Sequence, residues 1–323
     1  MSLYHKLESA IAQNSDSRNT LKAYWHVCRQ FYAFNRKPAS QWSGPDVQRW
    51  LQHLYRQNYS RSSRKTALNG LAYVFKHVIK ADMGRLDLPA MPPERKRLKI
   101  IPTREEIGRI FAGMKGQTRI VAGLLYGAGL RIEECCKLRV QDIDFGALTI
   151  RIHGGKGDKD RLTLLPTMMV EALRRQFDWR KALHELDLAS GCGLVEFPGQ
   201  LARKYRNANR ELRWQYFFPS AVVRGQYRWH ITPEAIQNAV RQAVQAAGII
   251  KRVTPHTLRH AFATHAMRMG NDIETVRNLM GHDSIETTAI YLHADAAQGR
   301  SPLDRTMVEP LPDFTALPAR VAG

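Results

Sequence analysis

The sequence predicts a mainly α-helical protein of two domains, with a small antiparallel β-sheet in the second domain. A chain of 323 residues is long enough for two domains, each with its own core. Apolar residues recur at helical spacing over the first ninety residues and again after residue 167. Between these regions, residues 147–166 form two β-branched runs around a Gly-rich turn, which indicates a pair of short strands.

The first domain, residues 1–93, is predicted to be entirely helical. One helix is expected over Ser17–Phe34, a second opens at Ser43 with Pro45 in its first turn, and a third begins near Ser62. This domain carries 14 Lys and Arg against 5 Asp and Glu. That excess suits a domain that grips DNA, although a solvated charged surface would give the same composition.

Residues 94–102 are predicted to be a linker, because the neighbouring prolines block regular structure. Its basic side chains suit a path along a phosphate backbone; they are Arg95, Lys96, Arg97 and Lys99. A capping box formed by Thr103 and Glu106 then opens the second domain, which is expected to extend to residue 295 and to be followed by a tail over 296–323.

The second domain is expected to begin helical, through about Leu138, and to become helical again from about Thr167. Thr232 as N-cap, Pro233 in the first turn and Gly248 beyond the end delimit one of its helices. Another helix is expected to begin at Pro255.

The charge of the chain points to a polyanionic partner. Lys and Arg number 49 against 29 Asp and Glu, which gives a net charge of +20. Nucleic acid is the usual partner of such a protein, the alternative being a protein that is simply basic. No apolar run is long enough for a membrane helix, and the first residues do not resemble a signal peptide, so the expected location is the cytoplasm. The four cysteines form no CxxC pair, so neither a zinc site nor a disulfide framework is expected.

Arg131 is the first candidate for chemistry. Gly127 and Gly129 interrupt the preceding helical run, which places Arg131 near the start of a helix. Glu134 follows one turn later, within reach of the guanidinium group. Taken alone, the two residues could equally form a structural salt bridge.

The stretch after Pro255 holds a second candidate group. His256 and Arg259 are three residues apart and therefore share one face of the expected helix. His260 lies one turn from His256, but no Glu stands between the two histidines as a zincin pattern requires, so no metal site is predicted. A histidine and an arginine presented together suit an anionic oxygen, because the guanidinium fork matches phosphate geometry.

Three further residues complete the set. Lys156 stands in the Gly-rich turn, His282 follows Gly281 at a helix end, and Tyr291 lies nine residues beyond His282. Each has an ordinary alternative: a solvated turn lysine, or a half-buried packing tyrosine. Together with the arginines they form a set suited to phosphoryl transfer, with a tyrosine nucleophile, cations for the phosphate oxygens and groups that move protons. Such a set needs no metal, ATP or other cofactor.

The order Arg…Lys…His-x-x-Arg…His…Tyr resembles the tyrosine recombinase (phage integrase) family over about residues 101–295. The resemblance implies a helical core-binding domain of SAM-like type followed by a mixed α/β catalytic domain. It implies catalytic roles for Arg131, Lys156, His256, Arg259, His282 and the nucleophile Tyr291, with Glu134 supporting the first arginine. Lys159 stands in the same turn as Lys156 and could take its role.

Residues 198–218 resemble the extra helical insertion of integron integrases. Its arginines form one helical stripe, and its aromatic residues suit stacking on unpaired bases. The expected DNA contacts of this insertion are Arg203, Lys204, Arg206, Arg210, Arg213, Trp214 and Tyr216. The alternative is a helix packed on its own domain through the aromatic residues, with the arginines in solvent.

The resemblance therefore implies an integron integrase that moves gene cassettes between folded single-stranded attC sites and duplex attI sites, as a homotetramer on DNA. A phage-type or chromosome-dimer-resolving recombinase that acts on duplex sites only is the nearest alternative. A type IB topoisomerase would share the chemistry without exchanging strands. A DNA-binding protein with an inactive site is the remaining alternative.

Overall fold

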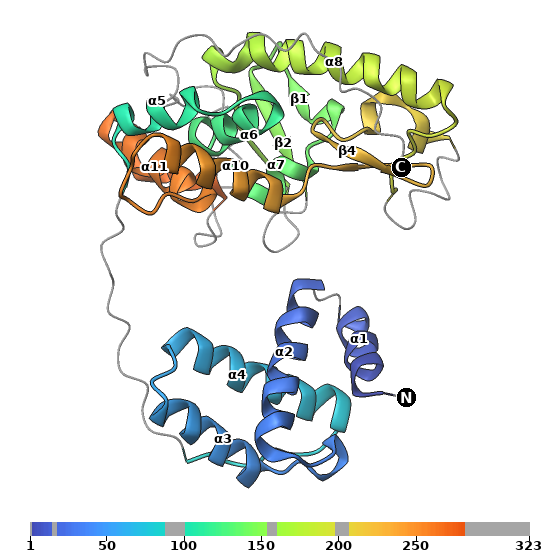
Figure 1. Ribbon diagram of the computed structural model, residues 1–323, viewed down its shortest axis with the longest axis vertical. Helices are drawn as coiled ribbons and strands as arrows, with labels where there is room; N and C mark the ends of the chain where they lie inside the picture. The colour runs from blue at the N-terminus through green and yellow to red at the C-terminus, as the bar shows by residue number, and fades with distance from the viewer. Residues whose placement is uncertain (1, 15–17, 88–100, 154–159, 198–206, 282–323) are drawn as a thin grey trace. The chain divides into compact units, whose positions relative to one another are not determined.

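The computed structural model describes residues 2–14, 18–87, 101–153, 160–197 and 207–281 (Figure 1). The chain divides into two compact units, Met1–Leu98 and Lys99–Gly323. The division falls within the stretch 94–102 that the sequence predicts to be a linker. Each unit is described by itself below.

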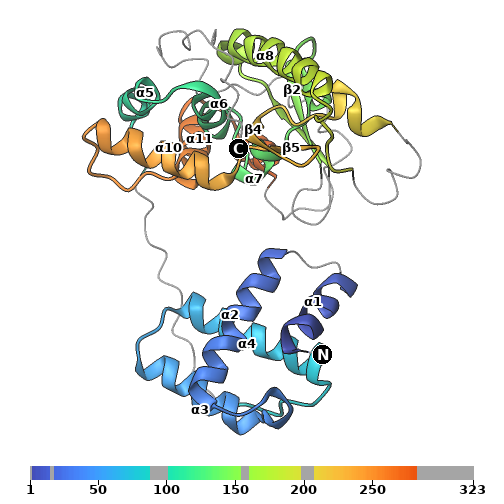
Figure 2. The ribbon, with the colours of Figure 1, turned by 45° about the vertical axis from the view of Figure 1, so that its right-hand side comes forward.

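The described part of the first unit is helical (Figure 2). Its elements are α1 (Leu3–Gln13), α2 (Arg18–Asn35), η1 (Ala39–Gln41), α3 (Gly44–Arg56), α4 (Arg61–Val74) and the π-turn η2 (Phe75–Ile79). The Ser43 side chain accepts a hydrogen bond from the backbone of Asp46, so α3 starts at the predicted cap. Phe31, Trp50 and Leu71 lie at the centre of the apolar core.

α-Helices are also the main elements in the described part of the second unit. They are α5 (Arg104–Ala112), α6 (Gly116–Gly127), α7 (Ile132–Lys137), α8 (Val170–Ala189), α10 (Pro233–Ala246), α11 (Pro255–Arg268) and α12 (Ile273–Met280). Helix α6 is buried along nearly its whole length and packs against α10 and α11. Thr103 and Glu106 form the predicted capping box, and Thr232 caps α10 as predicted. None of the described helices is both long and apolar enough to cross a membrane.

Two small antiparallel sheets accompany these helices. The first has the order β1 (Ile143–Asp144), β2 (Thr149–Ile152), β3 (Arg161–Leu164), with Ile150 opposite Thr163. Strands β2 and β3 are the predicted pair. The second sheet is the hairpin β4 (Pro219–Arg224) and β5 (Tyr227–His230), which the sequence analysis did not predict. The mainly α class with a small antiparallel sheet is confirmed, with this hairpin added.

The described end of the predicted insertion differs from the expected helix. Residues 207–218 contain two short 3-10 turns, η5 (Ala208–Arg210) and η6 (Leu212–Trp214). Glu211 between them has an extended backbone, with ψ of 137°. Arg210 and Arg213 therefore do not lie on one continuous helix, and the predicted helical stripe of arginines was wrong for this part. Residues 198–206 lie outside the described residues.

Candidate active site

Residues close to Arg131 in the sequence place it at the start of α7. Helix α6 ends at Gly127, and Gly129 turns the chain with φ of +65°. A side chain at Gly129 would place its Cβ 2.5 Å from the Phe262 ring, so glycine is required there for space as well. The Arg131 backbone N–H donates to Glu134 Oε2 at 2.7 Å, and its Nη1 donates to Glu134 Oε1 at 2.8 Å.

Arg259, on α11, also lies close to the Glu134 carboxylate. Thr254 caps this helix and Pro255 stands in its first turn, as predicted. The Arg259 side chain is 2% exposed and points inward. Its Nη1 donates to the carbonyl of Gly129 and lies 3.8 Å from Glu134 Oε2. Two arginines far apart in sequence therefore meet at one carboxylate.

A third arginine, which the sequence analysis missed, joins this group from β3. Arg161 forms two parallel hydrogen bonds with Glu134, from Nη1 to Oε1 at 2.8 Å and from Nη2 to Oε2 at 2.7 Å. The two residues are 27 positions apart, so no helical or strand spacing connects them. The only local signal was a charged residue at the start of a largely buried strand.

The three arginines also hold the end of α12. Arg161 Nε donates to the carbonyl of Leu279 at 3.4 Å, Arg259 Nη2 to that of Met280 at 2.6 Å, and Arg131 Nη2 to that of Gly281 at 2.8 Å. Gly281 is the left-handed C-cap, with φ of +63°. Cations are favourable at a helix C-terminus, where carbonyl groups lack helical partners. The residue that follows Gly281 in the sequence is His282.

The electrostatics of this group favour an anion. Burial by itself would raise the pKa of Glu134, but the hydrogen bonds and charges of Arg161 and Arg131 outweigh it and lower the pKa from 4.5 to about 2. Burial and the nearby charge of Arg131 lower the pKa of Arg259 to about 10, so this guanidinium also stays charged at neutral pH. Three guanidinium groups around one carboxylate leave an excess of positive charge, which suits a phosphate group.

His256 lies on α11 three residues before Arg259. Unlike Arg259, it is exposed, and its ring lies 4.1 Å from that of His260, centroid to centroid. His256 therefore lies at the surface of α11, one turn from the buried Arg259. Within the described residues, no group of three or more possible metal ligands occurs.

Comparison with known proteins identifies the family. Residues 102–298 match the Phage integrase family, and residues 3–85 match the N-terminal SAM-like domain of phage integrases. This chain belongs to the tyrosine recombinases of the phage integrase family. The chain is therefore an enzyme, a DNA strand transferase, and its predicted membership of the tyrosine recombinase family is confirmed.

Relatives of this recombinase cover most of its length. An Integrase/recombinase from Escherichia coli is 39% identical over 303 residues, which is 89% of both chains. Tyrosine recombinase XerA from Pyrococcus furiosus is 30% identical over 90% of this chain and 88% of its own. The fold resembles XerH bound to palindromic difH (TM-score 0.57, 19% identity, 92% of this chain and 82% of that one). It also resembles a lambda integrase dimer bound to a core site (TM-score 0.57, 14% identity, 88% and 98%).

Several residues that the sequence analysis singled out in this recombinase lie outside the described residues. Among the catalytic candidates these are Lys156, its alternative Lys159, His282 and Tyr291. Among the expected DNA contacts they are Arg95, Lys96, Arg97, Arg203, Lys204 and Arg206. The described catalytic candidates are thus Arg131, Glu134, His256 and Arg259.

The described part of the insertion separates into an exposed and a buried portion. Arg210 and Arg213 are exposed, and Trp214 is half-buried with the Arg213 guanidinium 5.7 Å from its ring. Tyr216 is only 7% exposed, with Arg139 over one face and His230 at its edge. The ring of Tyr216 is therefore already packed by this domain, and its contact with DNA stays a prediction.

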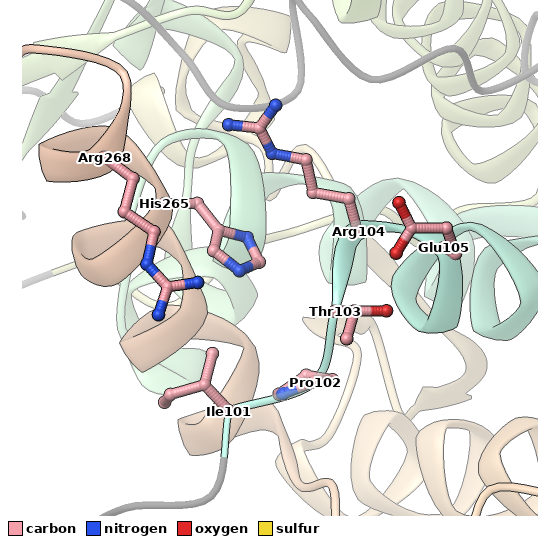
Figure 3. A pocket seen from close by; sticks show the side chains of 7 residues that line it. All are labelled: Ile101, Pro102, Thr103, Arg104, Glu105, His265 and Arg268. Atoms are coloured by element: carbon pink, nitrogen blue, oxygen red, sulfur yellow. The ribbon is translucent and has the colours of Figure 1, made fainter.

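A pocket of about 450 Å³ lies at the first turn of α5, and Glu134 and its three arginines are not among the residues that line it (Figure 3). Its lining residues are Ile101, Pro102, Thr103, Arg104, Glu105, His265 and Arg268. His265 Nδ1 is 3.0 Å from the Tyr126 hydroxyl. Burial and the charges of Arg104 and Arg268 lower the pKa of His265. The sequence analysis did not predict this pocket.

Proposed function

We propose that this recombinase is an integron integrase that cuts and rejoins DNA through a covalent bond to Tyr291. The observation that carries the proposal is the meeting of Arg131 and Arg259 at Glu134 and at the helix end that leads to His282. Two fixed guanidinium groups beside an exposed histidine suit the oxygens of a phosphodiester.

The proposed chemistry exchanges one phosphate ester for another. The hydroxyl of Tyr291 attacks the DNA phosphorus, a 3′-phosphotyrosyl bond forms, and the bond to the 5′ oxygen breaks. Arg131 and Arg259 stabilise the charge that develops on the non-bridging oxygens, while His256 and His282 hold the phosphate and move protons. Lys156, or Lys159 in the same turn, gives a proton to the departing 5′ oxygen. Rejoining reverses these steps, so we assign no metal ion and no ATP to the reaction.

Glu134 has a supporting role in this scheme. Its carboxylate holds the Arg131 guanidinium and the start of α7 through separate oxygens. A group that is pre-oriented does not have to reorganise as charge develops, which is the main advantage of such a site. Glu134 therefore acts through Arg131 and does not contact the phosphate.

One observation supports the integron subtype, beside the resemblance of residues 198–218. The described end of the insertion carries the exposed Arg210 and Arg213, and the Arg213 guanidinium lies 5.7 Å from the ring of the half-buried Trp214. A cation beside an aromatic ring suits an extruded base on a folded single strand. We propose attC-like folded strands and attI-like duplexes as its substrates.

The wider assembly follows from the same proposal. Residues 1–93 and the basic linker 94–102 would grip the duplex, residues 103–295 would form the catalytic domain, and 296–323 would be a tail. We propose a homotetramer on two DNA sites, acting on DNA in the cytoplasm. The alternative is a phage-type or chromosome-dimer-resolving recombinase that acts on duplex sites only.

A nicked suicide substrate tests the proposal, because loss of the short strand downstream of the cut traps the covalent adduct. The wild-type chain should form this adduct without added metal, and Tyr291→Phe should form none. An adduct with the Phe variant would overturn the assignment of the nucleophile. The same assay with an attC-like hairpin and its fully paired duplex separates the subtypes. Equal binding and cleavage of hairpin and duplex would overturn the integron assignment in favour of the duplex-only alternative.

A further inference from the structure

Arg161 is placed between the proposed catalytic arginines and the end of α12. Its side chain is 13% exposed, and both terminal nitrogens are directed at Glu134. Its Nε faces the carbonyl of Leu279 at 3.4 Å. With its nitrogens used in this way, Arg161 is turned toward the protein and not toward an incoming phosphate.

Glu134 depends on Arg161 for half of its hydrogen bonds. Oε1 accepts from Nη1 of both Arg131 and Arg161, and Oε2 accepts from the Arg131 backbone and from Arg161 Nη2. Fork-to-fork pairing of this kind fixes the plane of the carboxylate as well as its position. Without Arg161, Glu134 could rotate about its last side-chain bond, and Arg131 would lose its fixed partner.

The same side chain packs against the end of α12. An added Cβ at Gly281 would lie 2.8 Å from Arg161 Cδ and Nε, so the two residues are in close contact. Arg161 therefore fixes the distance between β3 and the last turn of α12. The carbonyl of Gly281 in turn accepts a hydrogen bond from Arg131. Arg161, Glu134, Arg131 and Gly281 therefore form a closed ring of contacts.

We infer that Arg161 is a positioning residue for strand cleavage, an inference that rests on the proposed function. It holds Glu134 in the plane that orients Arg131, and it sets the place from which the chain continues to His282. Misplacement of catalytic groups by about 1 Å can cost about 100-fold in rate, even when the change lies away from the reacting atoms. Loss of Arg161 should therefore slow the chemical step more than it weakens DNA binding.

A second buried arginine–carboxylate pair provides a matched control. Arg228 on β5 forms two hydrogen bonds with Asp187 on α8, and their side chains are 8% and 5% exposed. No contact links this pair to Glu134 in the described part of the chain. Arg228→Ala and Arg161→Ala thus both break a buried ion pair, but only Arg161→Ala disturbs the arginine group.

The test measures the single-turnover rate of adduct formation on a suicide duplex at saturating protein, alongside the Kd for DNA and the melting temperature. We expect Arg161→Ala to form adduct about 100-fold more slowly, with its Kd changed by less than about threefold. Guanidinium ion added at a non-denaturing concentration should restore part of the rate to Arg161→Ala. Arg228→Ala, compared at the same temperature interval below its melting point, should keep the wild-type rate and show no guanidinium rescue.

Arg161→Lys is the second variant, since it keeps the charge and the stem but cannot form the two parallel bonds. It should remain folded and cleave at least about 10-fold more slowly, even if Arg161→Ala does not fold. A wild-type rate for Arg161→Lys, or equal losses in the Arg161→Ala and Arg228→Ala variants, would overturn the inference. A wild-type chain that forms no Tyr291 adduct would instead overturn the proposed function, so the two failures are distinguishable.

Discussion

Arg131 and Arg259 donate to successive carbonyl groups at the end of α12, Arg131 to Gly281 at 2.8 Å and Arg259 to Met280 at 2.6 Å. The two side chains come from α7 and α11, and both are also close to Glu134. One helix end and one carboxylate therefore fix two guanidinium groups together. This relationship leads to the predictions below.

Arg259→Lys should lower the rate of adduct formation by about 100- to 1,000-fold, the usual cost of one donor to a developing oxyanion. Arg259 donates to the carbonyl groups of Gly129 and Met280 through two different nitrogens. A lysine keeps the charge, but its single ammonium group cannot bind both carbonyl groups and a phosphate at the same time. The measurement is the single-turnover rate on a suicide duplex. A matched lysine substitution of the exposed Arg241 on α10 should have no effect on this rate. An unchanged rate for Arg259→Lys would contradict a catalytic role.

Gly281→Ala should slow cleavage because it strains the C-cap of α12 and pushes against Arg161. The backbone at Gly281 has φ of +63°, and an added Cβ would lie 2.8 Å from the Arg161 side chain. Gly270→Ala is the matched control, since Gly270 also has positive φ, +90°, but no atom within 4 Å of an added Cβ. Both variants should lose about 1 kcal/mol of stability from the backbone, measured by denaturant unfolding. Only Gly281→Ala should lose cleavage rate as well, so equal rates for the two variants would disprove the role of this contact.

Glu134 should make the stability of the second unit depend on pH. Its pKa is lowered from 4.5 to about 2 in the folded chain, because the hydrogen bonds and charges of its arginine partners outweigh the effect of burial. Its stabilising contribution is therefore fully present above about pH 4.5 and is lost as the pH falls toward 2. Glu134→Gln should be less stable than wild type at pH 7, by a difference that shrinks between pH 4.5 and 3. The free energy of unfolding of both proteins, measured over this pH range, tests the prediction. A difference that stays constant with pH would show that the charge of Glu134 does not stabilise the group.

Trp214→Ala should weaken binding to an attC-like hairpin more than binding to a paired duplex. Stacking of one base on an aromatic ring is worth about 1–3 kcal/mol, which corresponds to about 5- to 150-fold in Kd. Tyr216→Phe is the matched control, because the ring is packed by Arg139 and His230 and phenylalanine keeps that ring. Filter-binding or fluorescence titrations of both DNAs give the comparison. Equal weakening on hairpin and duplex would count against base stacking at Trp214.

Local sequence rules predicted the individual parts of the site. Gly127 and Gly129 indicated that a helix would end before Arg131, and α6 does end at Gly127. Pro255 indicated the start of α11, which places His256 and Arg259 one turn apart. Capping residues, glycine and proline act through their own backbone, so their effects can be predicted from a few neighbouring residues.

What the sequence by itself determined is therefore the tyrosine recombinase family and the helix starts that carry Arg131, His256 and Arg259. Only the tertiary structure decided that Arg161 joins Glu134 over 27 residues and that Arg131 reaches Gly281 over 150. It also decided that Tyr216 is covered while Arg210 and Arg213 stay exposed. The physical reason is that burial and ion pairing depend on which surfaces come into contact when the chain packs. The spacing of neighbouring residues in the sequence does not predict such long-range contacts.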